Sequence, residues 1–146
     1  DGVYKLAVYN DKPTLKLSNT LEKISLPARK ETIRFFNGDG QSFADCVCLA
    51  DETTPAMMIH PYERDKHCSL AGLTAELLLE TVMDKGEIVR RESDVAAISE
   101  DCRKRLALVP EEHKRFEMPH TYKVGLSPKL ESVRNDLVTS LKRRQA

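Results

Sequence analysis

The fold of this chain is decided by residues 32–49, which read Thr32-Ile33-Arg34-Phe35-Phe36-Asn37-Gly38-Asp39-Gly40-Gln41-Ser42-Phe43-Ala44-Asp45-Cys46-Val47-Cys48-Leu49. Two runs typical of strands, Thr32–Phe36 and Ala44–Leu49, flank the turn residues Asn37–Gly40. Glycine, asparagine and aspartate tolerate the positive φ angles of hairpin turns, and we expect both glycines of this turn to supply them. The stretch therefore predicts an antiparallel β-hairpin.

Short strands are also expected on both sides of this hairpin. Alternating apolar and polar residues predict three strands before it: Val3–Tyr9, Thr14–Ser18 and Ile24–Leu26. In the second of these, Leu15 and Leu17 are expected to face inward. Residues 50–67 break into a loop around Met57-Met58-Ile59. A second hairpin is expected at Ala75–Met83 and Glu87–Arg90, turning through Asp84-Lys85-Gly86.

The last third of the sequence changes to helical spacing. Three helices are expected: one from about residue 95 behind a cap at Ser93 or Asp94, a short one over Glu111–Phe116 after Pro110, and one from Pro128 behind Ser127. Two apolar stripes mark the long helices: Val95, Ile98, Cys102 and Leu106, then Leu130, Val133, Leu137 and Leu141. Strands come first and helices last, so the predicted fold class is α+β.

The composition excludes several classes of protein. The 146 residues are 40% hydrophobic and 32% charged, with 23 basic and 23 acidic side chains. That apolar fraction is too high for a disordered chain, and no uncharged apolar stretch approaches the ~20 residues of a membrane span. Because acidic residues balance the basic ones, composition gives no case for nucleic acid. We therefore expect a globular protein that binds neither nucleic acid nor membrane.

The cysteines and the first residues indicate where the chain comes from. It has four cysteines, Cys46, Cys48, Cys68 and Cys102, and no recognisable secretion signal. A disulfide framework is therefore not expected, and we predict a cytoplasmic location. The sequence starts at Asp1 within a strand-like run, without an initiator methionine, and this predicts a piece whose upstream partner is absent.

Cysteine and histidine side chains offer two hypotheses for chemistry. Zinc ligands could come from Cys46, Cys48, His60, His67 and Cys68. Zinc sites favour two tight pairs, which this spacing lacks, so we interpret the cysteines as small buried residues and predict no metal site. General bases near neutral pH could come from His60, His67, His113 and His120, against the alternative of structural or surface histidines. No self-sufficient active site is predicted.

Three further motifs have a structural and a functional interpretation. Gly38-x-Gly40 joins two strands rather than a strand and a helix, so it indicates a turn and not a phosphate loop. The basic runs Arg103–Arg105 and Lys142–Arg144 are typical of solvated helix faces. Lys5 lies in an apolar strand pattern, where it is either an exposed strand residue or a cation directed at a phosphorylated ligand.

Blocks spread along nearly the whole chain carry a family resemblance. They are Gly2–Leu6, Pro13–Ser18, Glu22–Pro27, Lys30, Phe35–Asp45, Leu49–Glu52, His60-Pro61, Leu108–Phe116 and Pro119–Ser127, the last two being the most specific. In this order and spacing they resemble the C-terminal portion of nicotinate phosphoribosyltransferase. Two positions depart from that family, because Asp1 and Ala28 stand where it has glycine.

The resemblance implies a fold, an activity and partners. The fold is that of type II phosphoribosyltransferases, an irregular α/β barrel with a β-rich domain, working as a homodimer. The enzyme forms nicotinate mononucleotide from nicotinate and phosphoribosyl pyrophosphate in NAD salvage, coupled to ATP hydrolysis, with ATP and Mg²⁺ as expected cofactors. Residues 1–30 would continue strands from the absent upstream barrel and β-rich domain, and 31–146 would form the C-terminal α+β domain.

The same resemblance limits what this chain does itself. The phosphate-binding Gly/Thr loop and the histidine phosphorylated by ATP lie upstream in the family, so no catalytic residue and no bound cofactor is expected here. Lys5 is the one residue carried over, as a candidate contact to phosphoribosyl pyrophosphate. Two hypotheses stay open: a C-terminal part of an enzyme that is inactive alone, or a stand-alone binding or scaffolding module.

Overall fold

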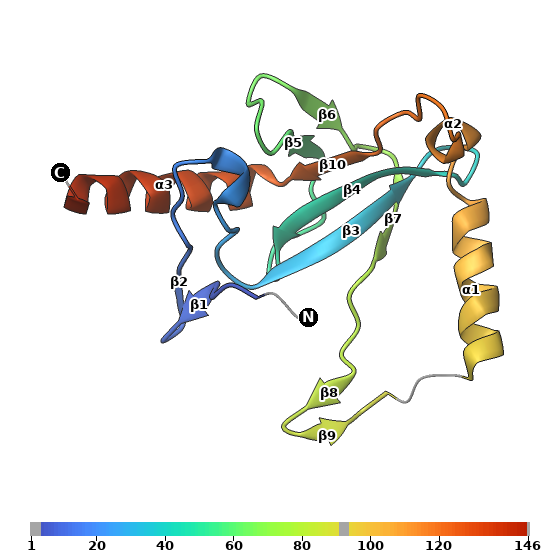
Figure 1. Cartoon of the computed structure of the whole chain (residues 1–146), viewed down its shortest axis with the longest axis horizontal. Helices are drawn as coiled ribbons and strands as arrows, with labels where there is room; N and C mark the ends of the chain where they lie inside the picture. The colour runs from blue at the N-terminus through green and yellow to red at the C-terminus, as the bar shows by residue number, and fades with distance from the viewer. Residues whose placement is uncertain (1–3, 91–93, 146) are drawn as a thin grey trace.

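A mixed six-stranded sheet forms the centre of the protein. The computed structural model describes residues 4–90 and 94–145 (Figure 1). The strand order is β6-β5-β10-β4-β3-β7. These strands are β3 (Lys30–Phe36), β4 (Ser42–Leu49), β5 (Met57–Ile59), β6 (His67–Ser69), β7 (Thr74–Leu77) and β10 (Lys123–Leu126). Two-stranded ribbons lie outside it: β1 (Val8–Tyr9) with β2 (Lys12–Pro13), and β8 (Met83–Asp84) with β9 (Glu87–Ile88). The helices are α1 (Val95–Ala107), α2 (Glu111–Lys114) and α3 (Pro128–Gln145), with a short 3-10 turn at Leu21–Lys23. The predicted α+β class is confirmed.

The β3–β4 hairpin is confirmed and extends beyond the predicted runs. Its turn is closed by a 2.9 Å hydrogen bond from the backbone N–H of Asn37 to the carbonyl of Gln41. The Asn37 side chain also accepts bonds from the backbone N–H groups of Asp39 and Gln41. Only Gly40 adopts a positive φ, of 75°, so the expectation that both glycines would do so is wrong for Gly38. The Asn37 side chain makes the turn contacts that the second glycine was expected to allow.

The order of strands and helices differs from the prediction at β10. This strand follows α1 and α2 in the sequence, yet it lies in the middle of the sheet, parallel to β4 and antiparallel to β5. The expectation of strands first and helices last is therefore wrong at this point. A parallel neighbour needs a long crossover, and residues 50–122 provide it between β4 and β10.

The N-terminal strands are shorter than predicted. Of the expected strand over residues 3–9, only Val8–Tyr9 forms a ladder, and Val3 lies outside the described residues. Residues 14–18 and 24–26 are not strands, because they hold each other by two bonds between Lys16 and Ser25 instead of a ladder. Leu15 is nevertheless buried and Leu17 half-buried, so the predicted inward direction is right.

A lysine closes the loop that leads into β3. Lys30 Nζ donates hydrogen bonds to the carbonyls of Leu26, Pro27 and Ala28. Burial lowers the pKa of this ammonium. Ala28 has a φ of 67°, in the left-handed region where glycine is favoured. The position at which this chain departs from the family's glycine is therefore one where the backbone conformation favours glycine.

The second predicted hairpin is only partly present. Lys85 and Gly86 both adopt positive φ angles and form its two-residue turn. The ladder, however, is limited to Met83–Asp84 and Glu87–Ile88. Thr74–Leu77 pairs with β3 instead, with Ala75 opposite Phe35. This segment therefore pairs with the edge of β3 and not with Glu87–Arg90, the partner predicted for it.

The helices begin where their caps predict, but they pack differently. Asp94 accepts a 2.8 Å bond from the N–H of Ala97 at the start of α1, and Ser127 accepts one from Leu130 at the start of α3. Helix α3 packs against β4 and β5, with Leu130 fully buried. Helix α1 has no buried residue. Among the described residues no helix is both long and apolar enough to cross a bilayer.

The core lies where the central strands meet. It consists of Ile33, Phe35, Ala44, Cys46, Cys48, Met58 and Leu70, each at most 5% exposed. No aromatic residue other than Phe35 is in this list, which follows from the few aromatic residues in the sequence. This core fixes the sheet on which the clefts described next are built.

Candidate functional site

Lys5, the predicted contact to phosphoribosyl pyrophosphate, is exposed and lies in the irregular segment before β1. Its Nζ donates a 3.4 Å hydrogen bond to the carbonyl of Lys23. Its neighbours Tyr4 and Leu6 are also exposed, by 94% and 61%. Lys5 lines neither of the two clefts described below. The role of Lys5 as a contact to phosphoribosyl pyrophosphate thus stays a prediction.

The larger cleft lies between the β5–β6 pair and β10. It has a volume of about 770 Å³, and its walls come from residues 58–68 and 121–125. The side chains that bring polar chemistry to it are His60, Tyr62, Asp65, Lys66, His67, Cys68, Tyr122 and Lys123. Two of the predicted histidines therefore meet here, together with Cys68. The predicted partners Cys46 and Cys48 lie instead in the core of the sheet.

His60 is committed to the turn that follows β5. Its Nδ1 accepts hydrogen bonds from the backbone N–H groups of Tyr62 and Glu63, at 3.3 and 3.1 Å. An imidazole that accepts at Nδ1 carries its proton on Nε2. Lys66 Nζ lies 2.7 Å from Glu63 Oε2, and this bond holds the pKa of the Glu63 carboxyl below its usual range. This geometry supports His60 as a structural histidine and not as a general base.

A second cleft, of about 640 Å³, lies beside α2. It is lined by Glu112, His113, Met118, Pro119, His120, Thr121 and Lys123. His113 Nδ1 is 2.8 Å from the carbonyl oxygen of His120, and the backbone N–H of His120 donates to the carbonyl of Glu112. The His113 ring also packs edge-on against Tyr122, with centroids 5.5 Å apart. These contacts fold residues 112–122 into a compact loop, in which His113 bonds through its ring and His120 through its backbone.

An ion-pair network, which sequence reasoning missed, joins this loop to the central hairpin. Arg34 donates to both carboxylate oxygens of Asp45, at 2.9 and 2.8 Å, and the Tyr122 hydroxyl donates to Asp45 Oδ1 at 3.1 Å. Burial and the Asp45 carboxylate raise the pKa of Tyr122. The hydrogen bond to Asp45 raises the pKa of Arg34. Arg34 and Asp45 are directly opposite in the β3–β4 register, so aligning the hairpin would have found this pair.

The central cysteines are not nucleophiles. Cys46 and Cys48 are 0% and 1% exposed, as their interpretation as buried strand residues predicted. Burial raises the pKa of Cys46 to about 12 and that of Cys48 to about 11. Because the thiolate is the reactive form, these thiols are inert near neutral pH.

Buried polar groups also anchor α3 to the sheet. Ser127 donates a 2.6 Å bond to Glu52 Oε2, and the same oxygen accepts from the backbone N–H of Leu49. One turn further on, Glu131 lies 3.4 Å from both Arg64 and Arg134. Both carboxylates therefore have partners within the domain and serve the packing of α3.

The described residues do not gather ligands for a metal. Among residues 4–90 and 94–145, no three His, Cys, Asp or Glu side chains lie close enough together to hold an ion. What the described residues offer is the two clefts above and a network that fixes the loop beside them.

Comparison with known families identifies the class of this domain. The family model described as "Nicotinate phosphoribosyltransferase C-terminal domain" matches residues 29–134, which is more than half of the chain. The chain belongs to the nicotinate phosphoribosyltransferase C-terminal domain family.

Individual relatives agree with the family match. The chain is 29% identical over 140 residues to a human nicotinate phosphoribosyltransferase, covering 93% of this chain and 26% of the relative. It is 29% identical over 135 residues to the nicotinate phosphoribosyltransferase of Bacillus subtilis, covering 86% and 28%. A crystal structure of human nicotinic acid phosphoribosyltransferase superposes with a TM-score of 0.78 at 26% identity, over 93% of this chain and 26% of that one. The chain thus spans about a quarter of the length of these relatives.

Proposed function

We propose that this chain is the C-terminal domain of an enzyme that forms nicotinate mononucleotide from nicotinate and phosphoribosyl pyrophosphate. The observation that carries the proposal is the family match over residues 29–134, in a chain that spans about a quarter of relatives bearing this enzyme's name. ATP hydrolysis, Mg²⁺, a homodimeric assembly and a cytoplasmic location belong to the same proposal. The upstream catalytic barrel is the partner of this domain within the same protein.

In this proposal the domain supports the reaction without performing it. Three polar groups of its clefts are already bonded within the domain: His60 to a turn, His113 to a carbonyl, and Tyr122 to Asp45. Side chains whose hydrogen bonds are satisfied hold a loop in place rather than exchange protons with a substrate. The chemistry would then come from the part of the enzyme that these residues do not include.

Activity measurements on two protein forms test the proposal. We expect the 146-residue chain to give no nicotinate mononucleotide from nicotinate, phosphoribosyl pyrophosphate, ATP and Mg²⁺. A longer protein that carries this chain behind a catalytic barrel is expected to give the product under the same conditions. Product from the 146-residue chain, or none from the longer protein, would contradict the proposal. A start codon near Asp1 in the coding sequence would instead favour the stand-alone binding or scaffolding module.

Lys5 is proposed to bind phosphoribosyl pyrophosphate in the longer enzyme. Negative charge builds on pyrophosphate as it departs, and a nearby ammonium stabilises that charge. The proposal is supported by the exposure of Lys5, whose Nζ makes a long bond to the Lys23 carbonyl. Lys5→Ala is expected to lower kcat/KM for phosphoribosyl pyrophosphate at least about tenfold, with KM for nicotinate little changed.

The control for Lys5 is an exposed lysine nearby. Lys12 is exposed and lies in β2, in the ribbon that follows the Lys5 segment in the sequence. Lys12→Ala removes one positive charge from this region without touching the proposed contact, and we expect it to leave kcat/KM unchanged. Equal kinetics for the Lys5 and Lys12 variants would show that Lys5 is only an exposed residue.

A further inference from the structure

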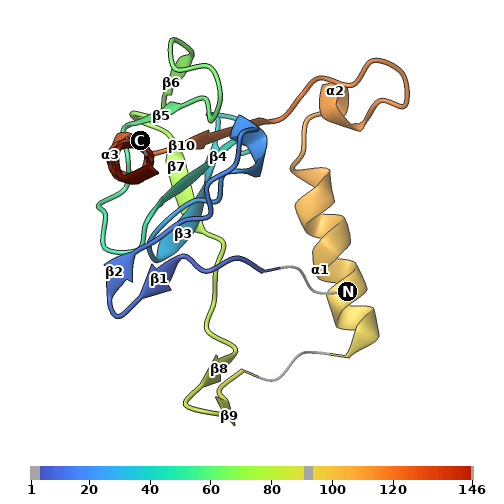
Figure 2. The same cartoon turned by 60° about the vertical axis from the view of Figure 1, so that its left-hand side comes forward.

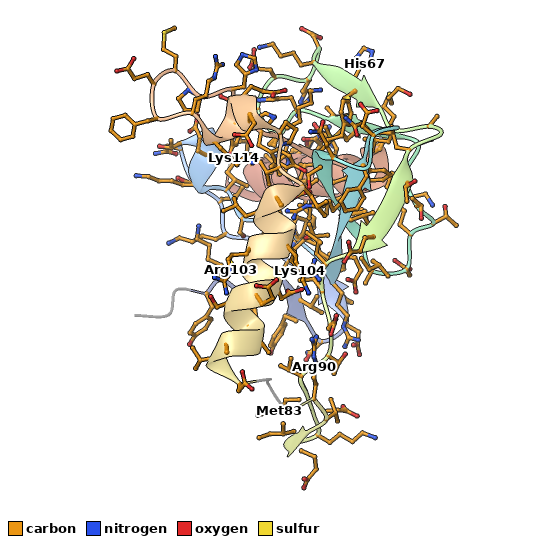
Figure 3. All side chains as sticks on the ribbon, turned by 90° about the vertical axis from the view of Figure 1, so that its right-hand side faces the viewer. His67, Met83, Arg90, Arg103, Lys104 and Lys114 are labelled. Atoms are coloured by element: carbon orange, nitrogen blue, oxygen red, sulfur yellow. The ribbon has the colours of Figure 1, made fainter. Side chains whose placement is uncertain are left out.

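The part of the domain that packs least well is an arm between β7 and α2. The arm comprises residues 78–90 and 94–109 of the described chain and contains β8, β9 and α1. Figure 3 looks at it from outside, with Arg103 and Lys104 along α1 and with Met83 and Arg90 at the hairpin below. Arg105 forms an ion pair with Glu76 of β7 at 3.2 Å, and the carbonyl of Leu108 accepts a hydrogen bond from the backbone N–H of Ser42. These two contacts hold the C-terminal end of the arm against the sheet.

Helix α1 carries an apolar stripe that is exposed in the part of the chain that the structure describes. Val95, Ile98 and Leu106 fall on one side of the helix and are 82%, 46% and 54% exposed. Cys102 lies on the same stripe and is also exposed. Among the described elements α1 packs closely against no helix or strand. The stripe that the sequence predicted is therefore present, but it faces no partner.

A helix of this kind does not hold itself together. It has 13 residues, and isolated helices of that length are marginal in water even for alanine-rich sequences. The Asp94 cap and the ion pairs of Glu100 with Arg103 and of Asp101 with Arg105 support it locally. Such surface pairs contribute little, and most helices in proteins are stabilised by packing an apolar face. Packing of the apolar face of α1 against a partner is therefore expected to contribute most of its stability.

The rest of the arm exposes apolar side chains in the same way. Residues that are 48–66% exposed include Leu79, Val82, Met83, Ile88 and Val89. A hollow of about 380 Å³ separates residues 76–82 from α1, where Asp101 and Arg105 line its far side. So many exposed apolar residues along one short stretch indicate an interface rather than a solvent-exposed surface.

We propose that the arm is an intramolecular clasp that holds the catalytic body preceding this domain in the same polypeptide. The α1 stripe and the β8–β9 hairpin would supply the apolar contacts. The proposal rests on the proposed function, since it takes the rest of a nicotinate phosphoribosyltransferase as its occupant. About three quarters of the length of the relatives lies outside this chain, which is ample to cover the arm.

The placement of the N-terminal segment favours this occupant over a second copy. In Figures 1 and 2, residues 4–7 run from β1 toward the side on which α1 stands. A body joined to the N-terminal end of this segment would therefore reach the arm directly. Tyr4 and Leu6, in the same segment, are exposed by 94% and 61% and would add apolar surface to such a contact. The superposition on the human crystal structure covers 93% of this chain. The part of this chain that is not covered is far shorter than the arm, so most of the arm has a counterpart in the human enzyme. That enzyme chain is about four times as long as this one.

Amide hydrogen exchange on the longer protein and on the 146-residue chain tests the clasp. In the 146-residue chain the α1 amides are expected to exchange within about tenfold of the rate of an unstructured peptide, while β3 and β4 stay protected. In the longer protein, the α1 amides are expected to exchange at least about a hundredfold more slowly. Protection that appears in the 146-residue chain and rises with its concentration would show that a second copy is the occupant, and would overturn the proposal.

Matched variants of the longer protein separate the apolar stripe from helix stability. Ile98→Gln with Leu106→Gln removes apolar surface from the stripe. Glu100→Gln with Lys104→Gln likewise introduces two glutamines, but on the opposite face of α1, and it also leaves the net charge unchanged. We expect the first pair to lower Tm by at least about 5 °C and to speed α1 exchange at least tenfold. The second pair is expected to change exchange much less.

The outcomes distinguish this inference from the proposed function. If the longer protein makes nicotinate mononucleotide while its α1 amides exchange freely, the clasp is wrong and the function stands. If α1 is protected but no product forms, the function is wrong and the contact stands. If the stripe variant does not fold, exchange on the unmodified longer protein still decides the matter. Equal effects of the two variant pairs would also overturn the clasp.

Discussion

Asp45→Ala is expected to lower the free energy of unfolding of this domain by about 2–4 kcal/mol. Asp45 accepts two bonds from Arg34 and one from Tyr122, and the side chains of Arg34 and Asp45 are only 24% and 13% exposed. Removing the carboxylate leaves a largely buried guanidinium without its partner and a buried hydroxyl without its acceptor. Losing a partner in this way costs more than the pair itself contributes. Urea unfolding followed by circular dichroism measures the change.

The control removes a carboxylate that has no such partners. Asp39 is exposed and lies in the turn between β3 and β4. We expect Asp39→Ala to change the free energy of unfolding by at most about 0.5 kcal/mol. A double variant tests the mechanism further. If an unpaired guanidinium causes the loss, Arg34→Met together with Asp45→Ala should cost less than the sum of the two single changes. Additive losses, or equal effects of Asp39→Ala and Asp45→Ala, would show that the network does not stabilise the domain.

The sequence predicts best what neighbouring residues determine. Asn37, Gly40 and Gly86 mark turns, while Asp94 and Ser127 mark helix starts, and all five features act within a few residues. The chemistry of a cap or a turn does not depend on the rest of the fold. For that reason the central hairpin and all three predicted helices are present.

Strand pairing between distant segments is where sequence reasoning fails. Lys123–Leu126 is four residues long, contains a glycine and has no clear alternation, so nothing local marks it as a central strand. It becomes one because β4 offers a free edge from Ala44 to Val47. Conversely, Thr14–Ser18 alternates well but has no ladder partner. Strand propensity depends strongly on context, and here the available edge decides.

The same limit applies to the candidate sites. Sequence reasoning could propose His60 and His113 as bases, but only the structure shows that the Nδ1 atom of each ring has a partner on the backbone. It could also predict two amphipathic helices without telling where each stripe is buried. Leu130 of α3 finds its partner inside the domain, whereas Ile98 of α1 does not. The spacing of apolar residues along a helix predicts that one face is buried, but it does not identify the element or protein that buries it.

Gly125→Ala is expected to destabilise the domain by about 3 kcal/mol, at the upper end of typical overpacking costs. Gly125 lies in β10, between β4 and β5. A Cβ at this position would lie 2.8 Å from Cγ and Sδ of Met58, and 2.9 Å from its Cβ. Met58 is 4% exposed and belongs to the core, so it has little room to move. Thermal and urea unfolding of the variant measure the cost.

The Cβ of Met58 is what makes this cost hard to relieve. A new rotamer can move Cγ and Sδ, but Cβ is fixed to the backbone, so β5 and β10 must separate slightly to accept the added methyl group. Met58→Ala should therefore rescue Gly125→Ala only in part, with a coupling of roughly 1 kcal/mol between the two changes. Gly38→Ala is the matched control, because a Cβ there meets nothing within 4 Å and its φ is not positive. We expect Gly38→Ala to be neutral or slightly stabilising. Full rescue by Met58→Ala would mean that only the flexible end of the methionine clashes, and an effect of Gly125→Ala as small as that of Gly38→Ala would mean that β10 is not held tightly against β5.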